Sequence, residues 1–229
     1  MLHLILADSE LETVPLEISS DKSIGRKARK RGRRPTELIL DSNYFHRPMK
    51  KLDDSERRGR PDIVHVCMLT ALDSPLNHED FLRFSVHTRQ DKIIEVDPET
   101  RIPRSYNRFV GLMEQLFLTG EVPPENPLMK IEDATLPEKV KEVKPEKVVT
   151  LREDGERIRR ENLFRELSRK DDLLAIVGGF PHGEFLSDVH SLSDQIIRIY
   201  PKTLEAVTAV THIIQFYEEE HLENSLFDG

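Results

Sequence analysis

Short apolar runs typical of β-strands alternate with amphipathic helix patterns along most of this chain. The strand patterns cover residues 2–7, 37–40, 63–72, 82–86, 93–96, 129–131, 148–151, 173–177 and 195–199, and the helix patterns cover residues 103–118, 136–143, 158–169 and 203–221. Such alternation is typical of an α/β fold whose helices cover a mostly parallel sheet. Two of the strands indicate a β-hairpin near residues 81–98, which we expect to be a small insertion that decorates the sheet.

The composition limits the class of protein. At 229 residues the chain is long enough for one large domain. No apolar run is long enough to span a bilayer, and residues 1–7 lead into Asp8 without a secretory cleavage site, so we expect a cytoplasmic protein without a membrane partner. Cys67 is the only cysteine, which excludes an intramolecular disulfide and a zinc site made of several cysteines. We therefore expect no metal.

The net charge of −8 conceals a segregated distribution of charge. Seven of the nine residues from 26 to 34 are basic, whereas four glutamates lie between residues 218 and 223. A chain of this kind attracts phosphate locally although it is acidic overall. We expect residues 22–35 to form a flexible, solvated basic loop, of the sort that closes on RNA.

Three arginines are grouped at the start of a helix pattern. Arg101, Arg104 and Arg108 have the spacing i, i+3, i+7, so on a helix they would point the same way, roughly 115° from its buried face. Guanidinium groups side by side repel one another unless an anion lies among them. The pattern leaves two interpretations open, a phosphate-binding surface and a solvated charged flank.

A glycine-rich turn follows the most apolar of the predicted strands. Residues 173–177 are continuously apolar and lead into Gly178-Gly-Phe-Pro-His-Gly183, which lacks the order of a dinucleotide-binding fingerprint. Ligands in open α/β sheets bind beyond the carboxyl ends of the strands, and glycine lets the backbone approach a ligand closely. We expect a small-molecule pocket here, with apolar walls from Leu151, Phe180 and Ile197. An ordinary turn is the alternative interpretation.

Three blocks of sequence resemble a known family. They are RPDIVHVCMLTALDSPLN at residues 60–77, RIPRSYNRFVGLMEQL at residues 101–116 and VGGFPHGEF at residues 177–185. Together they are similar to the archaeal form of the small-subunit rRNA pseudouridine N1-methyltransferases, the SPOUT-class assembly factors of the essential-for-mitotic-growth family. The resemblance implies a single SPOUT-type methyltransferase domain over residues 1–229 with a C-terminal trefoil knot, an exception to the usual absence of knots. It also implies a homodimer, with ribosomal assembly proteins as candidate partners.

The resemblance implies roles for individual residues. Arg60 matches an RNA-contacting arginine, and Asp62 matches the carboxylate that orients it and is also a candidate general base. The other RNA-binding arginines match Arg101, Arg104 and Arg108. The positions that match the loops that bind S-adenosylmethionine are Leu151, Gly178, Gly183, Ile196, Ile197, Arg198, Ile199, Tyr200 and Pro201.

The implied reaction is methylation of N1 of a pseudouridine in small-subunit (16S/18S-type) rRNA, with S-adenosylmethionine as donor and a role in biogenesis of the small ribosomal subunit. The nitrogen must lose its proton as it attacks the methyl group, and holding the two reactants at near-attack distance supplies much of the rate. Two alternatives stay open. In the first, the chain is a non-catalytic rRNA-binding assembly factor. In the second, it is a SPOUT methyltransferase that acts on tRNA.

Overall fold

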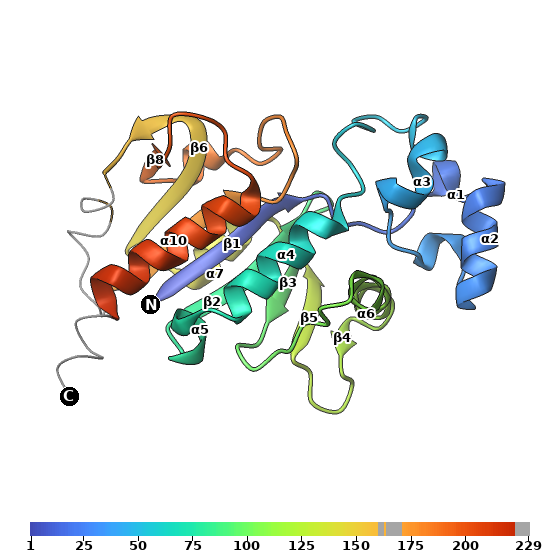
Figure 1. Ribbon diagram of the computed structural model, residues 1–229, viewed down its shortest axis with the longest axis horizontal. Coiled ribbons are helices and arrows are strands. Elements are labelled where there is room, and N and C mark those ends of the chain that lie inside the picture. The colour runs from blue at the N-terminus through green and yellow to red at the C-terminus, as the bar shows by residue number, and fades with distance from the viewer. Residues whose placement is uncertain (160–162, 164–170, 223–229) are drawn as a thin grey trace.

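The computed structural model describes residues 1–159, 163 and 171–222. Within these residues, eight strands form one sheet in the order β4-β5-β3-β2-β1-β7-β6-β8 (Figure 1). The strands are β1 (Leu2–Ser9), β2 (Leu82–Thr88), β3 (Lys92–Val96), β4 (Glu121–Val122), β5 (Met129–Asp133), β6 (Lys147–Arg157), β7 (Leu173–Gly178) and β8 (Gln195–Arg198).

The centre and one side of this sheet are parallel. The strand β1 pairs in parallel with both β2 and β7, and β6 pairs in parallel with β7 and β8. The strands β3, β5 and β4 extend the other side by antiparallel pairing. The prediction of an α/β fold is confirmed, and the sheet is mixed rather than purely parallel.

The strands β2 and β3 do not decorate the sheet. They pair antiparallel, as the pattern near residues 81–98 predicts, but β2 also pairs with the central strand β1 and β3 with β5. Both strands are therefore interior members of the sheet. The insertion expected at this point is wrong, because the two strands bury their apolar side chains on the common core, as Phe84 and Ile94 show.

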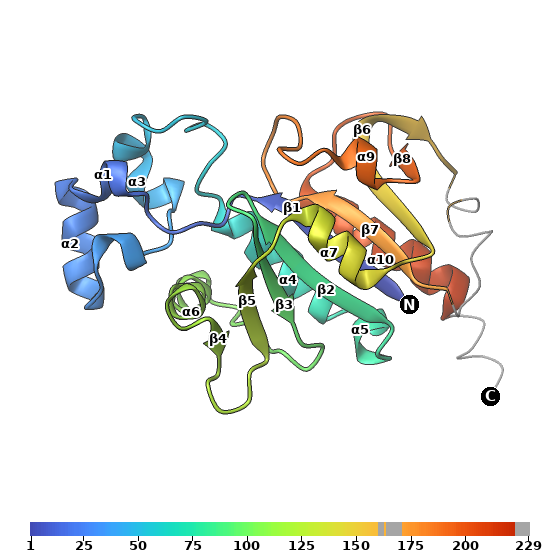
Figure 2. The ribbon, with the colours of Figure 1, turned by 180° about the vertical axis from the view of Figure 1, so that it is seen from behind.

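Helices cover both faces of the parallel region. The helices α4 (Pro61–Leu72) and α10 (Ala206–His221) lie on one face, and α7 (Leu136–Val143) and α9 (Val189–Leu192) lie on the other (Figures 1 and 2). Alternate residues of β1 serve the two layers, since Leu4 packs in the core beneath α4 and α10 whereas Ile5 packs with α7 and α9. Burial on both faces explains why the central strands are apolar without alternation.

Residues 63–72, predicted as a strand, form the helix α4. Pro61 occupies the first helical position and Asp62 the first turn, both of which favour a helix start. The helix is apolar on most sides because it packs on the sheet and against α10, which lies beside it on the same face (Figure 1). Its sequence therefore lacks the period of an amphipathic helix and resembles a buried strand.

A small helical lobe occupies residues 14–52, with its own apolar cluster of nine buried side chains (Figure 1). Its elements are α1 (Leu16–Ser19), α2 (Lys22–Arg31), the 3₁₀-helix η1 (Pro35–Glu37) and α3 (Ser42–Met49). The strand predicted at residues 37–40 is wrong: Pro35 begins the 3₁₀ turn, and Ile39 makes only an isolated bridge to Thr13.

The basic loop expected at residues 22–35 is also wrong, because most of it is the helix α2. The side chain of Asp21 accepts a hydrogen bond from the backbone N–H of Ser23 at 2.8 Å and caps the helix start. Gly32, with φ of 61°, ends the helix in a left-handed conformation. Ile24 and Ala28 are one turn apart and anchor the helix in the lobe's apolar cluster.

Three of the four predicted helices are present among the described residues. Residues 136–143 form α7 as predicted, and residues 203–221 form α10 apart from the first three. The pattern at residues 103–118 gives α6 (Tyr106–Thr119), and the short α5 (Pro75–His78) follows α4. The helix expected at residues 158–169 lies largely outside the described residues. Among the described helices, none combines the length and apolar character needed to cross a bilayer.

Candidate active site

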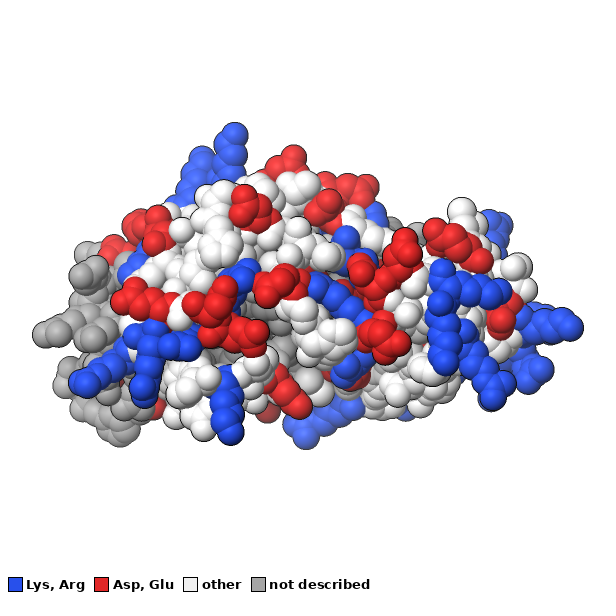
Figure 3. Space-filling model, turned by 90° about the horizontal axis from the view of Figure 1, so that it is seen from above, with Lys and Arg blue, Asp and Glu red and all other residues white. Residues whose placement is uncertain are grey.

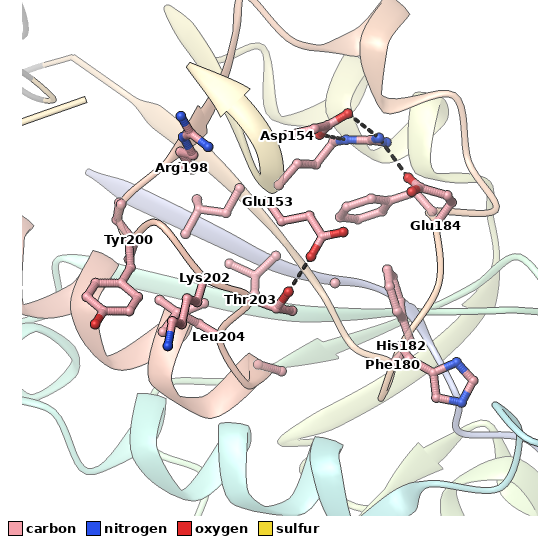
Figure 4. Close-up of a pocket in the computed structure, with 18 of the residues that line it drawn as sticks. Glu153, Asp154, Phe180, His182, Glu184, Arg198, Tyr200, Lys202, Thr203 and Leu204 are labelled. Atoms are coloured by element: carbon pink, nitrogen blue, oxygen red, sulfur yellow. Dashed lines mark hydrogen bonds and ion pairs between the residues drawn. The ribbon is translucent and has the colours of Figure 1, made fainter. Parts of the chain in front are cut away.

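A cavity of about 310 Å³ opens at the carboxyl ends of β6, β7 and β8 (Figure 4). Its walls come from residues 151–154 of β6, from residues 177, 178 and 180–185 at and after β7, and from residues 197–200, 202–204, 206 and 209 between β8 and α10. The strand β6 loses register between Leu151 and Glu156, which both lie opposite Ile197. The residues between them leave the sheet and reach the cavity. Its volume is at the lower end of the range for small-molecule sites.

The cavity gathers most of the residues predicted to bind a donor. The predicted positions that line it are Leu151, Gly178, Gly183, Ile197, Arg198, Ile199 and Tyr200. Ile196 and Pro201 are not among the lining residues. Ile196 precedes Ile197 in β8, and successive side chains of a strand point to opposite faces. All three predicted apolar walls, Leu151, Phe180 and Ile197, line the cavity.

Two glycines fit the backbone to this cavity. A Cβ atom at Gly155 would lie 2.5 Å from the backbone carbon of Ile197, so only glycine lets β6 pass β8 this closely. Gly183 has φ of 90°, a conformation that other residues rarely adopt. Residues with larger side chains at these positions would move the strand and the loop that form the walls.

Arg57, which no motif in the sequence distinguishes, holds the loop of residues 180–184. Its guanidinium carbon lies 4.0 Å from the ring centroid of Phe180, and its Nη1 donates a hydrogen bond to the carbonyl oxygen of Glu184. The imidazole Nε2 of His182 is also 3.2 Å from the carbonyl oxygen of Glu56. The segment before α4 therefore fixes the loop that follows β7.

Arg57 belongs to a buried cluster of charges centred on Glu10. The carboxylate of Glu10 is fully buried and accepts hydrogen bonds from Nε of Arg57 and, at 2.9 Å, from Nη1 of Arg89. Two guanidinium groups share this one carboxylate. The pairing satisfies the buried charge of Glu10 and fixes Arg57 beside the cavity loop.

Asp8 anchors the far end of the same loop. It adopts φ of 50°, and its carboxylate accepts hydrogen bonds from the backbone N–H groups of Leu186 and Ser187 at 2.7 and 3.0 Å and from the Ser187 hydroxyl at 2.7 Å. Burial alone would raise the pKa of Asp8, but hydrogen bonds with His87 and Ser187 outweigh burial and lower it.

Replacement of Asp8 with asparagine is expected to lower the free energy of unfolding by about 2 kcal/mol at pH 7, because one carboxylate oxygen becomes a donor facing donors. Asparagine tolerates the positive φ. Since the pKa of Asp8 is lower in the folded state than its ordinary 3.8, the stabilisation is complete above that value and is lost as the pH falls through the folded pKa. Urea unfolding should show the full difference in free energy of unfolding between variant and wild type at pH 7 and a smaller difference at pH 3. An equal difference at both pH values would contradict this role for the carboxylate.

Arg60 and Asp62 form a bidentate pair at the start of α4. The Nε and Nη2 atoms of Arg60 donate to the two carboxylate oxygens of Asp62 at 2.9 and 2.7 Å. The hydrogen bond with Asp62 is the main cause that raises the pKa of Arg60. Both side chains are about one-third exposed, so the pair presents an oriented guanidinium to solvent.

This pair is two hydrogen bonds from the cavity loop. The backbone N–H of Arg60 donates to the carbonyl oxygen of Glu10 at 2.9 Å. The backbone N–H of Glu10 in turn donates to the carbonyl oxygen of Gly179 at 3.2 Å. The helices α4 and α10 run side by side in the same direction (Figure 1). Their C-terminal ends lie together, because the carboxylate of Glu218 in α10 accepts a hydrogen bond from the backbone N–H of Leu76, just beyond α4. Their N-terminal ends, with Arg60 before α4, therefore lie at the same edge of the sheet. Arg60 therefore stands beside the cavity.

The other three arginines do not share a helical face. The helix α6 begins at Tyr106, so Arg101 and Arg104 precede it and only Arg108 is helical. Before the helix, the carbonyl oxygen of Pro103 contacts Nε2 of His65 on α4 at 2.8 Å, and the N-cap residue Ser105 is extended. All three arginine side chains are exposed. The contact with His65 holds them at the end of α4 that carries Arg60.

Acidic and polar side chains complete the rim of the cavity. Arg152 binds Asp154 through two hydrogen bonds of 2.8 and 2.9 Å and lies 2.7 Å from a carboxylate oxygen of Glu184 (Figure 4). The hydroxyl of Thr203 donates to Glu153. Buried Nε of Arg198 has no hydrogen-bond partner among the described residues. The rim thus offers carboxylate acceptors and apolar walls to one ligand.

A glycine-lined cavity at the carboxyl edge of parallel strands, beside an oriented arginine and further exposed arginines, defines an α/β protein that binds a small molecule next to an anion-binding surface. The family model described as EMG1/NEP1 methyltransferase matches residues 4–218. The chain belongs to this family.

Curated relatives and a solved structure agree with this assignment. The ribosomal RNA small subunit methyltransferase Nep1 of Thermococcus onnurineus is 48% identical over 218 residues, which are 95% of this chain and 98% of that protein. The Nep1 protein of Pyrococcus furiosus is 48% identical over 219 residues, 96% of this chain and 97% of its own. The crystal structure of Archaeoglobus fulgidus Nep1 bound to S-adenosylhomocysteine superposes with a TM-score of 0.84 at 33% identity, covering 95% of this chain and 97% of that one.

Proposed function

We propose that this chain transfers the methyl group of S-adenosylmethionine to N1 of a pseudouridine in small-subunit rRNA, and so takes part in biogenesis of the small ribosomal subunit. The observation that carries the proposal is the short hydrogen-bonded connection between the loop of the cavity and Arg60. The relatives are named as small-subunit rRNA methyltransferases, and one of them binds S-adenosylhomocysteine.

The residues of the cavity fit the donor. Apolar walls from Leu151, Phe180 and Ile197 suit an adenine ring, and carboxylates on the rim suit ribose hydroxyls and a cationic group. When bound, the donor supplies an electrophilic methyl group on sulfur. The remaining predicted positions, Ile196 and Pro201, support this site from the adjoining backbone.

The chain's own residues orient the acceptor. Arg60, fixed by Asp62, contacts the RNA beside the cavity, while Arg101, Arg104 and Arg108 bind neighbouring phosphates. Both oxygens of Asp62 are engaged by Arg60, so orientation of the guanidinium is a better role for this carboxylate than removal of the N1 proton. Holding the nitrogen in line with the methyl group lowers the barrier through proximity.

Methyl transfer to short rRNA hairpins that carry either pseudouridine or uridine at one position tests the reaction. We expect transfer to the pseudouridine RNA and at least about 100-fold less to the uridine RNA, because uridine uses N1 for its glycosidic bond. Equal methylation of both would refute N1 specificity. A tRNA hairpin methylated in preference would favour the tRNA enzyme, and absence of donor binding by calorimetry would favour a non-catalytic assembly factor.

We propose further features of the family for this chain: one methyltransferase domain, a trefoil knot near the C-terminus, a homodimer in the cytoplasm and contacts with ribosomal assembly proteins. The strand order β7-β6-β8 followed by the return of α10 to pack on α4 supports a chain that crosses itself in this region. Exposed Leu186 and Tyr200, 50% and 53% accessible, support a partner subunit beside the cavity. Light scattering after size-exclusion chromatography measures the oligomeric state.

A further inference from the structure

The helix α2 presents four cations on one side. With 100° of rotation per residue, Lys22, Arg26, Arg29 and Lys30 fall opposite the buried side chains of the helix, and all four are exposed. We call these four residues the α2 ridge. Like charges at spacing i, i+4 destabilise a helix, so an anion that binds the ridge would relieve an existing repulsion.

The ridge is free, whereas other cations of the same run are engaged. Arg31 donates to the carboxylate of Glu114 at 2.6 Å, and Arg33 donates to the side-chain oxygen of Gln115 at 2.7 Å. Within the part of the chain that the structure describes, no carboxylate lies at ion-pair distance from a ridge side chain. The basic run therefore divides into residues that dock the lobe and residues that face solvent.

The docking residues place the ridge close to the arginines of the active site. Glu114 and Gln115 lie on α6, whose first turn carries Arg108, and seven residues of helix span about 10 Å. The hydroxyl of Tyr44 in α3 donates to Asn107 of that first turn at 3.2 Å. The space-filling view shows Lys and Arg side chains gathered over the helical lobe (Figure 3). The lobe that carries the ridge is thus docked on the helix whose first turn carries Arg108.

A hollow beside the ridge has the chemistry of a phosphate site. Its volume is about 450 Å³, and its lining includes Lys22, Arg26, Arg29 and Arg33. Ser19, Ser20 and Asp21 also line it; the carboxylate of Asp21 accepts hydrogen bonds from Ser23, and the Ser19 hydroxyl donates to the carbonyl oxygen of Leu16. Planar guanidinium groups match phosphate oxygens in geometry, and the Ser20 hydroxyl can donate to the same oxygens.

We propose that the α2 ridge binds the sugar–phosphate backbone of the RNA substrate outside the segment that enters the active site. Docking of the lobe on the helix that carries Arg108 favours RNA over an acidic protein, because one polyanion can then reach both surfaces. The inference rests on the proposed function only in that the substrate is RNA. The ridge adds affinity without reading bases, since contacts to phosphate carry no sequence information.

A double variant, Arg26→Ala with Lys30→Ala, tests the ridge in the full chain. Binding is measured without donor to two RNAs, the minimal target hairpin and the same hairpin with its stem extended by about ten base pairs. We expect the dissociation constant for the extended RNA to rise about 10-fold and its log–log dependence on salt to become shallower by about 2. Binding of the minimal hairpin should stay within about 2-fold of wild type.

The matched control is Lys130→Ala with Lys141→Ala, which removes the same charge from two exposed side chains on β5 and α7. It should bind both RNAs as wild type does. Equal affinities of the ridge variant and the control for the extended RNA would overturn the proposal. Unchanged RNA binding with weaker binding of polyglutamate would overturn it in favour of an acidic protein. Normal RNA binding by wild type without methyl transfer would contradict the proposed function alone.

Discussion

Replacement of Glu10 with alanine is expected to lower the free energy of unfolding by about 3 kcal/mol and to weaken donor binding about 10-fold. The fully buried carboxylate serves Arg57 and Arg89, so its removal leaves two guanidinium groups near one another without their shared anion. Arg57 then no longer holds Phe180 and the backbone of Glu184 in place. In the variant the donor must order this loop as it binds, whereas in the wild-type protein the loop is already ordered. The free energy needed for ordering weakens donor binding.

Glu12→Ala is the matched control for this prediction. Glu12 is also fully buried, and its two carboxylate oxygens accept hydrogen bonds from Arg58, both at 2.8 Å. Arg58 makes no contact with the cavity loop among the hydrogen bonds of the described residues, so we expect a comparable loss of stability with donor affinity unchanged. Urea unfolding and calorimetry with S-adenosylhomocysteine measure the two quantities. Equal donor affinities in the folded Glu10 and Glu12 variants would contradict the role of Arg57 in holding the loop.

Local patterns predict the parts of the fold whose burial is simple. The strand at residues 173–177 is apolar because it is central, and α7 is amphipathic because one side faces solvent. The helix α4 is enclosed by the sheet and α10, and this burial arises only from tertiary packing. Pro61 and Asp62 are the local signals that could have identified it as a helix.

The basic run shows the opposite error. A high density of like charge suggested a loop, but Ile24 and Ala28 are spaced to bury one side of a helix, and Asp21 and Gly32 are typical cap residues. Caps and two apolar anchors outweigh the repulsion among exposed cations, because the lobe buries those anchors in its own apolar cluster. The cap residues were visible in the sequence.

Predictability of the candidate site depends on distance along the chain. The glycine-rich turn directly follows the apolar strand β7 in the sequence, so a ligand site at this strand end could be predicted, and the cavity lies there. The contact between Glu10 and Arg57 joins residues 47 positions apart, and no spacing in the sequence indicates it. The three arginines were grouped correctly but for the wrong reason, since Arg101 and Arg104 are exposed in the non-helical segment before α6 rather than on a helix.

Arg60→Ala is expected to reduce methyl transfer at least about 100-fold while donor affinity stays within about 2-fold of wild type. The side chain pairs only with Asp62 among the described residues and is one-third exposed, whereas its backbone N–H keeps the hydrogen bond to Glu10. The fold and the cavity should therefore persist. Transfer at saturating donor and RNA, a binding titration with the hairpin and calorimetry with S-adenosylhomocysteine separate these effects. Equal losses of RNA and donor binding would indicate misfolding instead.

Asp62→Asn and the double variant, Arg60→Ala with Asp62→Asn, distinguish orientation from proton removal. If Asp62 only orients Arg60, its substitution adds nothing once Arg60 is alanine, and the two changes are strongly non-additive. If Asp62 takes the N1 proton, the double variant loses a further factor in kcat, and the rise of kcat with pH changes in both variants that lack the Asp62 carboxylate but not in Arg60→Ala. The bidentate geometry, with both oxygens of Asp62 within 2.9 Å of the guanidinium, leads us to expect the non-additive result.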